Sequence, residues 1–471
     1  MKRDNKVMPS LAEAIRQTGL RDGMTVSFHH HLRDGDAVLN LVLAECEKLG
    51  VRDLTVNASA LMACHHPIVD FIRKGTVTGI ECNYMHPVVG HEISKGLLAR
   101  EVIFRSHGGR PAALERKEAH IDVAFIAAST SDRAGNCNGR DGRTAFGSIG
   151  YAMPDAEHAD NVVVVTDHLA PYPVSVASID ERYVDAVVVI DSIGDPDKIM
   201  SGTTRVTRDP IGLLIADYTA RALSASGLLE DGLSFQTGAG GTSLAVASFI
   251  GEIMRGRGIR GSFASGGITG MLVDLFQEGL FETLIDVQCF DRDAVRSIRD
   301  NEKHREISAS TYASPAVKSS VVDHLDIVIL GATEIDSQFN VNVHTDSNGF
   351  IMGGSGGHSD TAAGAKLSVI VAPLIRARLP LIVDRVGTIS TPGKDVDLLV
   401  TQYGLACNPE KTELDYRLRS AGLPVFTIEE LHERAVGITG VPGRHPSQGR
   451  PVARVVSRDG DLLDIIRAVN R

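Results

Sequence analysis

The chain repeats several short motifs at a nearly constant spacing, and this repeat constrains the fold more than any other feature. The paired motifs lie 204, 207 and 209 residues apart: His120-Ile-Asp-Val123 with His324-Leu-Asp-Ile327, Ser148-Ile-Gly150 with Ser355-Gly-Gly357, and Asp22-Gly23 with Asp231-Gly232. Motifs that recur in the same order at one spacing indicate a duplicated structural unit. The sequence therefore predicts two related domains, residues 1–208 and 209–471.

Apolar runs separated by amphipathic stretches predict the class of the fold. The runs at 120–126, 162–165 and 187–190 are nearly continuous, as in strands buried on both faces of a sheet. Residues 38–49 instead carry apolar side chains at helical spacing. Because strands that alternate with helices form largely parallel sheets, we expect an α/β fold with two related domains of largely parallel sheet and flanking helices.

Composition and charge exclude several classes of protein. With 471 residues and a net charge of −11, the chain is too long for one ordinary core and too acidic for general nucleic-acid binding. No apolar stretch approaches the roughly 20 residues that a membrane helix needs. The six cysteines form no C-x-x-C pair, and no signal peptide precedes them. We expect a cytoplasmic protein that binds neither nucleic acid nor membrane.

A glycine turn at 238–243 is the first candidate for a ligand site. It follows the apolar run at 233–236 and precedes a helical pattern, so its backbone N–H groups and the helix dipole favour an oxyanion. A tight strand-to-helix turn without a ligand explains the same residues, and neither standard nucleotide fingerprint matches. Comparable glycine turns lie at Ser106–Arg110, Ser265–Gly270 and Gly353–Ser359.

Histidines and arginines gather at two expected strand ends. His29, His31 and Arg33 follow one strand, and His107 and Arg110 follow another. Adjacent histidines in an extended segment cannot all converge on one metal ion, so we favour binding of a carboxylate over binding of a metal.

Glu334 ends the strand that begins at His324. A carboxylate there can face a ligand, or it can serve as a cap or an ion-pair partner.

Several of these stretches resemble the alpha subunits of citrate lyase, which are citrate:acetyl-carrier-protein transferases. The matching stretches span nearly the whole chain: Cys64–Pro67, Ser106–Arg110, His120–Ile126, Ser201–Arg205, Gln236–Gly241, Glu334–Asp336, Phe339–Asn342 and Gly353–Asp360. More distantly, the glycine turns and the duplicated plan resemble the coenzyme A transferase fold. That resemblance implies two such domains with the site between them.

The resemblance implies a transferase reaction and its partners. Acetyl on a carrier-protein thioester would be exchanged for citryl, with release of acetate, and a beta subunit would then cleave the citryl thioester. The acyl-carrier gamma subunit would bear a phosphoribosyl-dephospho-coenzyme A group, for which acetyl-coenzyme A can serve as a surrogate. No metal is expected in this subunit, which would work within an oligomeric complex.

One departure from the coenzyme A transferase pattern bears on mechanism. Many such enzymes use a glutamate nucleophile at the position that is Gly266 here. We therefore predict direct attack of a citrate carboxylate on the acetyl thioester, through a mixed anhydride, with Glu334 as the alternative nucleophile.

The predicted roles fall into three groups. Backbone donors near the thioester would be Gly238, Gly240 and Gly241. Residues near the carrier arm would be Gly266, Gly267, Gly356, Gly357 and His358. The citrate set would be His29, His31, Arg33, His107 and Arg110.

Two other functions fit the same residues. One is a coenzyme A transferase for another small carboxylic acid, and the other is a non-catalytic scaffold that presents the carrier protein.

Overall fold

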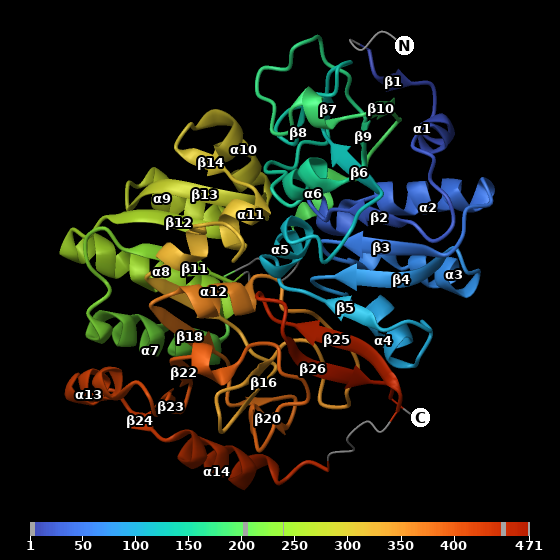
Figure 1. Cartoon of the computed structure of the whole chain (residues 1–471). Coiled ribbons are helices and arrows are strands. Elements are labelled where there is room, and N and C mark those ends of the chain that lie inside the picture. The colour runs from blue at the N-terminus through green and yellow to red at the C-terminus, as the bar shows by residue number, and fades with distance from the viewer. Residues whose placement is uncertain (1–4, 201–205, 239, 444–448, 470–471) are drawn as a thin grey trace.

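Two large sheets, one from each half of the chain, form the body of the molecule (Figure 1). The structure is a computed structural model that describes residues 5–200, 206–238, 240–443 and 449–469. Both sheets are mostly parallel and helices flank them, so the predicted α/β class is confirmed. Below, the residues up to 208 are called the first half and the remainder the second half.

The first sheet has ten strands. In spatial order these are β1 (Val7–Met8), β10 (Ala186–Val189), β9 (Asn161–Thr166), β6 (Val123–Ala128), β2 (Thr25–Phe28), β3 (Leu54–Ala58), β4 (Val77–Cys82), β5 (Val102–Phe104), β25 (Pro451–Val456) and β26 (Leu462–Arg467). The helices of the first half are α1 (Leu11–Gln17), α2 (Val38–Lys48), α3 (Ile68–Arg73), α4 (Pro87–Ser94), α5 (Gly109–Glu115) and α6 (Met153–His158). Only the β25–β26 pairing is antiparallel among the described strands of this sheet.

The second sheet has nine strands. In spatial order these are β14 (His304–Glu306), β13 (Phe281–Cys289), β12 (Gly261–Ile268), β11 (Ser234–Thr237), β15 (Ile327–Leu330), β18 (Leu367–Val371), β22 (Leu398–Thr401), β23 (Gly404–Cys407) and β24 (Val425–Phe426). The helices of the second half are α7 (Pro210–Ser226), α8 (Gly241–Arg257), α9 (Gly270–Gln277), α10 (Arg292–Asp300), α11 (Ala309–Ala313), α12 (His358–Gly364), α13 (Thr412–Ser420) and α14 (Ile428–Thr439).

Small sheets lie outside the two large ones. They pair β7 (Thr130–Ser131) with β8 (Cys137–Asn138), β19 (Ile375–Arg376) with β20 (Leu379–Pro380), and β16 (Glu334–Asp336) with β17 (Val341–Asn342) and β21 (Ile382–Val383).

The two sheets share one strand order, which agrees with the repeat in the sequence. The first sheet runs β5-β4-β3-β2-β6-β9-β10, and the second runs β14-β13-β12-β11-β15-β18-β22. Registers also agree, since Val26 pairs with Val123 in the first sheet and Phe235 pairs with Ile327 in the second. These pairs are related by the same 209- and 204-residue spacings as the motifs.

The C-terminal hairpin returns to the first sheet. Strand β25 pairs in parallel with β5, so Val455 lies beside Phe104 although most of the second half separates them in sequence. The expected domain boundary between residues 208 and 209 stays a prediction, and the hairpin shows that one sheet draws on both halves.

Burial explains why the central strands are apolar throughout. All six residues of β6 are buried, as are all four of β15, because helices cover both faces of each sheet. Burying a large apolar side chain contributes about 1.5–3 kcal/mol, so such strands stabilise the two sheets.

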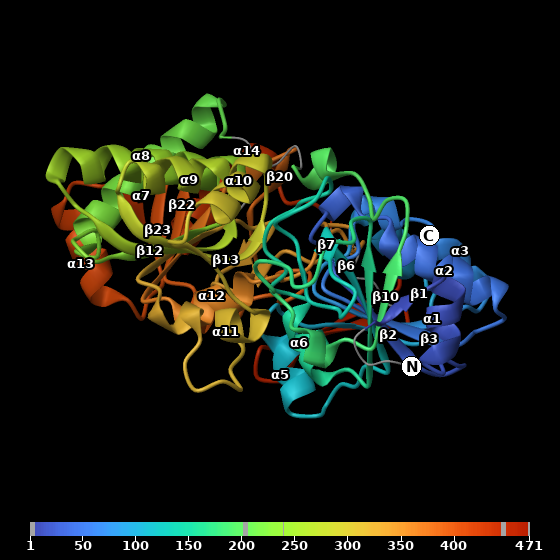
Figure 2. The same cartoon turned by 90° about the horizontal axis from the view of Figure 1, so that it is seen from above.

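The carboxyl ends of the central strands point toward the boundary between the halves. Helices α5, α6, α11 and α12 lie there, between the two sheets in both views (Figures 1 and 2). The loops after β2 and β5 therefore meet loops of the second half, and parallel α/β folds bind ligands at such strand ends. Among the described helices, none is long and apolar enough to cross a membrane.

Candidate functional site

A cluster of stacked rings lies at the boundary between the halves. Its centre is Tyr151, whose ring centroid lies 4.4 Å from that of His107, 5.1 Å from that of His30 and 5.8 Å from that of His31. All four side chains are buried or nearly so. The structure thus brings His31 and His107 together, as predicted, around a tyrosine that the sequence did not single out.

A buried carboxylate holds the predicted citrate residues His29 and Arg110. The two terminal nitrogens of Arg110 each donate to Asp155 at 2.6 Å, while its Nε donates to Asn57 Oδ1 at 2.6 Å. His29 Nε2 lies 2.8 Å from the same Asp155 carboxylate. Burial raises the pKa of Asp155, but Arg110 and His29 outweigh it and hold that pKa well below its usual range.

This geometry assigns Arg110 an indirect influence on the cluster. Its guanidinium is buried and donates to Asp155 and Asn57 with all three nitrogens, so its described bonds orient protein groups. The direct contact with citrate expected for Arg110 stays a prediction.

The buried histidine rings have lowered pKa values and nitrogen atoms without a described partner. Burial lowers the pKa of His30 and of His31 well below the usual value, and burial with the nearby Arg110 lowers the pKa of His107 to about 3. Near neutral pH these three rings are therefore uncharged and can each donate one hydrogen bond and accept another. The Nδ1 atoms of His29, His31 and His107 are buried without a hydrogen-bond partner among the described residues, which suits them to a polar ligand.

Arg33 reaches the site from the same loop. Its guanidinium carbon lies 4.4 Å from the centroid of the Phe290 ring, at the end of β13. A Cβ on Gly267 would collide with that ring, so this glycine is needed for the packing of Phe290. This cation–π contact thus joins a guanidinium of the first half to an aromatic ring of the second half.

The glycines at 356 and 357 form the opposite side of the cluster. Gly356 accepts a hydrogen bond at its carbonyl from the backbone N–H of His107, at 2.8 Å. A Cβ would lie 3.3 Å from His107 Nε2 at Gly356, and 2.8 Å from the Tyr312 hydroxyl at Gly357. Both positions therefore allow the main chain to approach the rings more closely than a side chain would.

The glutamine Gln236 connects the ring cluster with the glycine turn at 238. Its Nε2 donates to the Tyr312 hydroxyl at 2.7 Å, and its Oε1 accepts from Ser265 at 3.0 Å. Gly266 has a φ of +103°, and a Cβ there would lie 2.7 Å from the Gln236 side chain. A glutamate at position 266 would meet both obstacles, so the packing of Gln236 requires glycine here.

The turn after Gln236 leads directly into α8. The N–H of Gly238 donates to the Ile329 carbonyl at 2.9 Å and so stabilises the sheet. Gly240 caps α8 in an extended conformation, and Gly241 begins it. The first-turn amides of a helix lack intrahelical acceptors, and the role of Gly240 and Gly241 as donors to a ligand stays a prediction. Ala239 and the matching stretch Ser201–Arg205 lie outside the described residues.

His358 and Glu334 lie beyond the ring cluster. The two ring nitrogens of His358 contact the Thr391 hydroxyl and the Gly331 carbonyl, each at 2.8 Å, and burial lowers its pKa to about 4. Glu334 accepts from the N–H of Gly387 at 2.9 Å. It lines a separate cavity of about 670 Å³, whose described lining includes none of the other predicted site residues.

Asp360 joins the halves beside His107. Its carboxylate accepts from the Ser106 hydroxyl at 2.6 Å and from the N–H of Gly108 at 2.9 Å. Burial raises the pKa of Asp360 to about 6, although these two hydrogen bonds lower it.

Two described clusters have residue types that could hold a metal ion. The buried one combines Asp286, Cys289 and His304, and the exposed one combines His120, Asp122 and Asp160. In the buried cluster, the thiol donates to Asp286 Oδ2 at 2.9 Å and His304 Nε2 lies 3.1 Å from the same oxygen. These contacts already explain the arrangement as a hydrogen-bonded triad.

Comparison with known proteins relates the whole chain to one family. The family model for citrate lyase, alpha subunit (CitF), matches residues 4–469. The citrate lyase alpha chain of Klebsiella pneumoniae is 48% identical over 468 residues, which cover 99% of this chain and 92% of that protein.

Solved structures agree with this relationship. A Streptococcus mutans structure, assigned as the alpha subunit of citrate lyase in complex with citrate, superposes with a TM-score of 0.98 at 47% identity and covers 100% of this chain and 92% of that one. An acyl-CoA transferase from Escherichia coli O157:H7 has a TM-score of 0.59 at 15% identity, covering 86% of this chain and 88% of its own, and so shares the fold.

Replacing Asp155 with Asn should strongly destabilise the protein. The change leaves the buried Arg110 without its counter-charge, and breaking a buried ion pair costs about 3–5 kcal/mol. The free energy of unfolding, measured by urea titration, should fall by that amount. Asp160→Asn is the control, because Asp160 pairs with His120 at the surface and its loss should cost at most about 1 kcal/mol. Equal effects of the two changes would contradict a stabilising role for the buried pair.

Replacing Asp360 with Asn should change how stability depends on pH. The folded-state pKa of about 6 exceeds the ordinary value of about 3.9. The contribution of Asp360 to the free energy of unfolding is therefore greatest below about pH 4 and falls as pH rises through 6, by about 3 kcal/mol in all and about 1 kcal/mol between pH 5 and 7. In urea titrations, the free energy of unfolding of the wild type should therefore fall between pH 5 and 7 by about 1 kcal/mol more than that of Asp360→Asn. Equal changes in the two proteins would refute the raised pKa of Asp360.

Proposed function

The chain belongs to the citrate lyase alpha subunit family, the transferase component of citrate lyase, and we propose that it exchanges acetyl for citryl on a thioester and releases acetate. The thioester would be carried by a phosphoribosyl-dephospho-coenzyme A group on the gamma subunit, with acetyl-coenzyme A as a surrogate. The observation that carries the proposal is the buried ring cluster at the boundary between the halves, where the Nδ1 atoms of His31, His107 and the adjacent His29 are buried without a described hydrogen-bond partner.

Citrate would occupy the side of the cluster formed by the first half. Arg33 would supply positive charge next to Phe290, and the Nδ1 atoms of His29, His31 and His107 would form hydrogen bonds with the substrate. Arg110 would orient His29 through Asp155. The complex of the Streptococcus mutans relative with citrate supports a citrate site in this family.

The thioester would lie against the glycine turns of the second half. Gly356 and Gly357 bring the main chain close to His107 and Tyr312, and the carrier arm would lie along this segment. The N-terminus of α8 at Gly240 and Gly241 would stabilise the oxyanion, and Gly266, Gly267 and His358 would shape the surrounding surface. A single oxyanion donor is worth about 2.7–4 kcal/mol of transition-state stabilisation.

The transfer would proceed without a covalent enzyme intermediate. A citrate carboxylate oxygen attacks the acetyl carbonyl, and the C–S bond breaks. The thiolate departs, and a mixed acetyl-citryl anhydride is formed. The thiolate then attacks the citryl carbonyl of that anhydride and expels acetate. Gly266 in place of a glutamate favours this route, and alignment of the two substrates alone can be worth about 7–11 kcal/mol.

The proposal includes the setting of the enzyme. A beta lyase subunit would cleave the citryl thioester, and the carrier subunit would move it between sites within an oligomeric complex. All six cysteines are free thiols, as is usual in a reducing compartment, and we place the complex in the cytoplasm.

Activity of the isolated chain tests the proposal directly. Acetyl-coenzyme A and citrate should yield acetate and citryl-coenzyme A, measured by liquid chromatography. Gly240→Val should lower the rate at least about 100-fold, because it alters the turn that would stabilise the oxyanion. The chain should stay folded, because the nearest atom to a Cβ at this position is Ser243 Oγ at 3.9 Å.

The matched control is Gly256→Val, on an exposed part of the same helix, which should retain activity. Turnover with other carboxylates but not citrate would indicate a different coenzyme A transferase, and inactivity with a panel of carboxylates would indicate a carrier scaffold.

A trapping experiment distinguishes direct transfer from a glutamyl intermediate. Incubation with acetyl-coenzyme A and hydroxylamine should leave the enzyme active, because no enzyme thioester forms. A glutamyl hydroxamate on the wild-type enzyme, detected by mass spectrometry and absent from Glu334→Ala, would instead identify Glu334 as the nucleophile and overturn the direct route.

A further inference from the structure

A segment of the first half, Gly147–Tyr151, lies on the second sheet and is called the strap below. Ser148 donates through its hydroxyl to the Asp286 carbonyl at 3.1 Å, and the Gly150 carbonyl accepts from the N–H of Ala309 at 2.9 Å. The strap therefore crosses the boundary between the halves before it reaches Tyr151.

The strap is the repeat counterpart of the loop at Ser355–Gly357. In that loop the Gly356 carbonyl accepts from the N–H of His107, and in the strap the Gly150 carbonyl, one position further along the repeat, accepts from the N–H of Ala309. Each half thus places a glycine-containing segment on the strand-to-helix turn of the other. One of these contacts touches the ring cluster directly, and the other reaches it through Tyr151.

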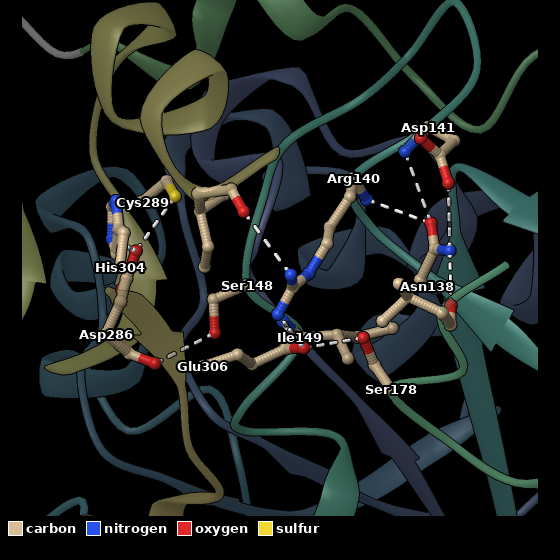
Figure 3. A network of polar contacts seen from close by, with 12 residues as sticks. Asn138, Arg140, Asp141, Ser148, Ile149, Ser178, Asp286, Cys289, His304 and Glu306 are labelled. Atoms are coloured by element: carbon tan, nitrogen blue, oxygen red, sulfur yellow. Dashed lines mark hydrogen bonds and ion pairs between the residues drawn. The ribbon is translucent and has the colours of Figure 1, made fainter. Parts of the chain in front are cut away.

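Glu306, at the end of β14, anchors the strap. Its carboxylate accepts from the backbone N–H of Ile149 at 2.6 Å, from the Ser178 hydroxyl at 2.6 Å and from the Arg140 guanidinium at 3.1 Å (Figure 3). The Glu306 side chain is 5% exposed. All three donors belong to the first half, so one carboxylate of the second half holds two loops of the first, the one after β8 and the one after β9.

The partners of Glu306 are themselves held in place. Arg140 also donates to the Ile298 carbonyl at 3.3 Å, and Asn138 accepts at its Oδ1 from the backbone N–H groups of Arg140 and Asp141 (Figure 3). Because both sides are preorganised, the Glu306 contact sets the position of the strap with little freedom.

One residue, Gly150, separates the anchored Ile149 from Tyr151 of the ring cluster. Ile149, which donates to Glu306, is followed by Gly150 and then Tyr151, whose N–H donates to His31 Nε2 at 3.3 Å. A displacement at Ile149 would therefore move the Tyr151 ring relative to His31 and His107.

We propose that Glu306 is a positioning residue for the transfer reaction, because it holds the strap that places Tyr151 among the histidine rings. This inference rests on the proposed function of the ring cluster. Glu306 itself touches no predicted substrate residue and would act only through the strap. Misplacement of reacting groups by about 1 Å can lower a rate about 100-fold, so the effect should be large.

A double-mutant cycle separates positioning from a general structural role. Glu306→Ala should lower kcat for acetyl-coenzyme A and citrate about 100-fold. In a Tyr151→Leu background, Glu306→Ala should lower kcat by less than a further factor of about three, because the ring that the strap positions is already absent. If Glu306→Ala lowers kcat by the same factor with and without Tyr151→Leu, the proposal is overturned. It is also overturned if a folded Glu306→Ala has unchanged kinetics.

Two further variants keep the result interpretable. Glu306→Gln retains one acceptor for the N–H of Ile149, so its kcat should fall only about tenfold. This loss should also become smaller in the Tyr151→Leu background. If Glu306→Ala fails to fold, wild-type kinetics of Glu306→Gln would still refute the inference. Glu115→Ala is the matched control, since Glu115 also bridges the halves, through the Ser314 hydroxyl at 2.6 Å, without touching the strap. It should keep kcat within about twofold.

Failure of the proposed function has a distinct outcome. If the wild-type chain shows no turnover, the proposed reaction is wrong, and calorimetric titration with citrate then tests Glu306 independently. If Glu306→Gln binds citrate more weakly than Glu115→Ala does, the result would support the proposal that Glu306 positions the rings. Equal binding by the two variants would overturn that proposal.

Discussion

The structure depends on carboxylates buried where the two halves meet. A buried charge without a partner is strongly unfavourable, so each of these groups must be satisfied by specific donors. Asp155 binds Arg110 and His29 within the first half, whereas Asp360 and Glu306 accept donors from the opposite half. These contacts require one relative placement of the halves and thereby determine where the ring cluster lies.

Close approach of the main chain is the second requirement at this boundary. Gly150 and Gly356 lie where a Cβ would press on the other half, and Gly356 has a left-handed φ of +52°. The duplicated fold uses this device twice, once in the loop near His107 and once in the strap. A substrate between the halves would therefore be surrounded by main-chain groups and rings, in a setting that excludes water.

Part of the site could be predicted from the sequence. His31 and His107 follow separate strands and meet as expected, because carboxyl ends of parallel strands lie at one edge of a sheet. Tyr151 and Asp155 could not be found this way, since no local pattern marks a residue whose partners come from elsewhere in the chain. Nor did any motif indicate that Asp155 and Asn57 would engage the Arg110 guanidinium, because those contacts depend on how α5 and α6 pack.

The sequence by itself determined the α/β class, the duplicated plan and the family, because apolar periodicity, motif order and glycine turns are properties of neighbouring residues. Tertiary structure alone decided that β25 extends the first sheet, that Glu334 lines a separate cavity, and that Glu306 holds the strap. The physical reason is that backbone pairing and buried ion pairs join residues far apart in the chain. Their energies depend on distances and burial, which no local pattern in the sequence specifies.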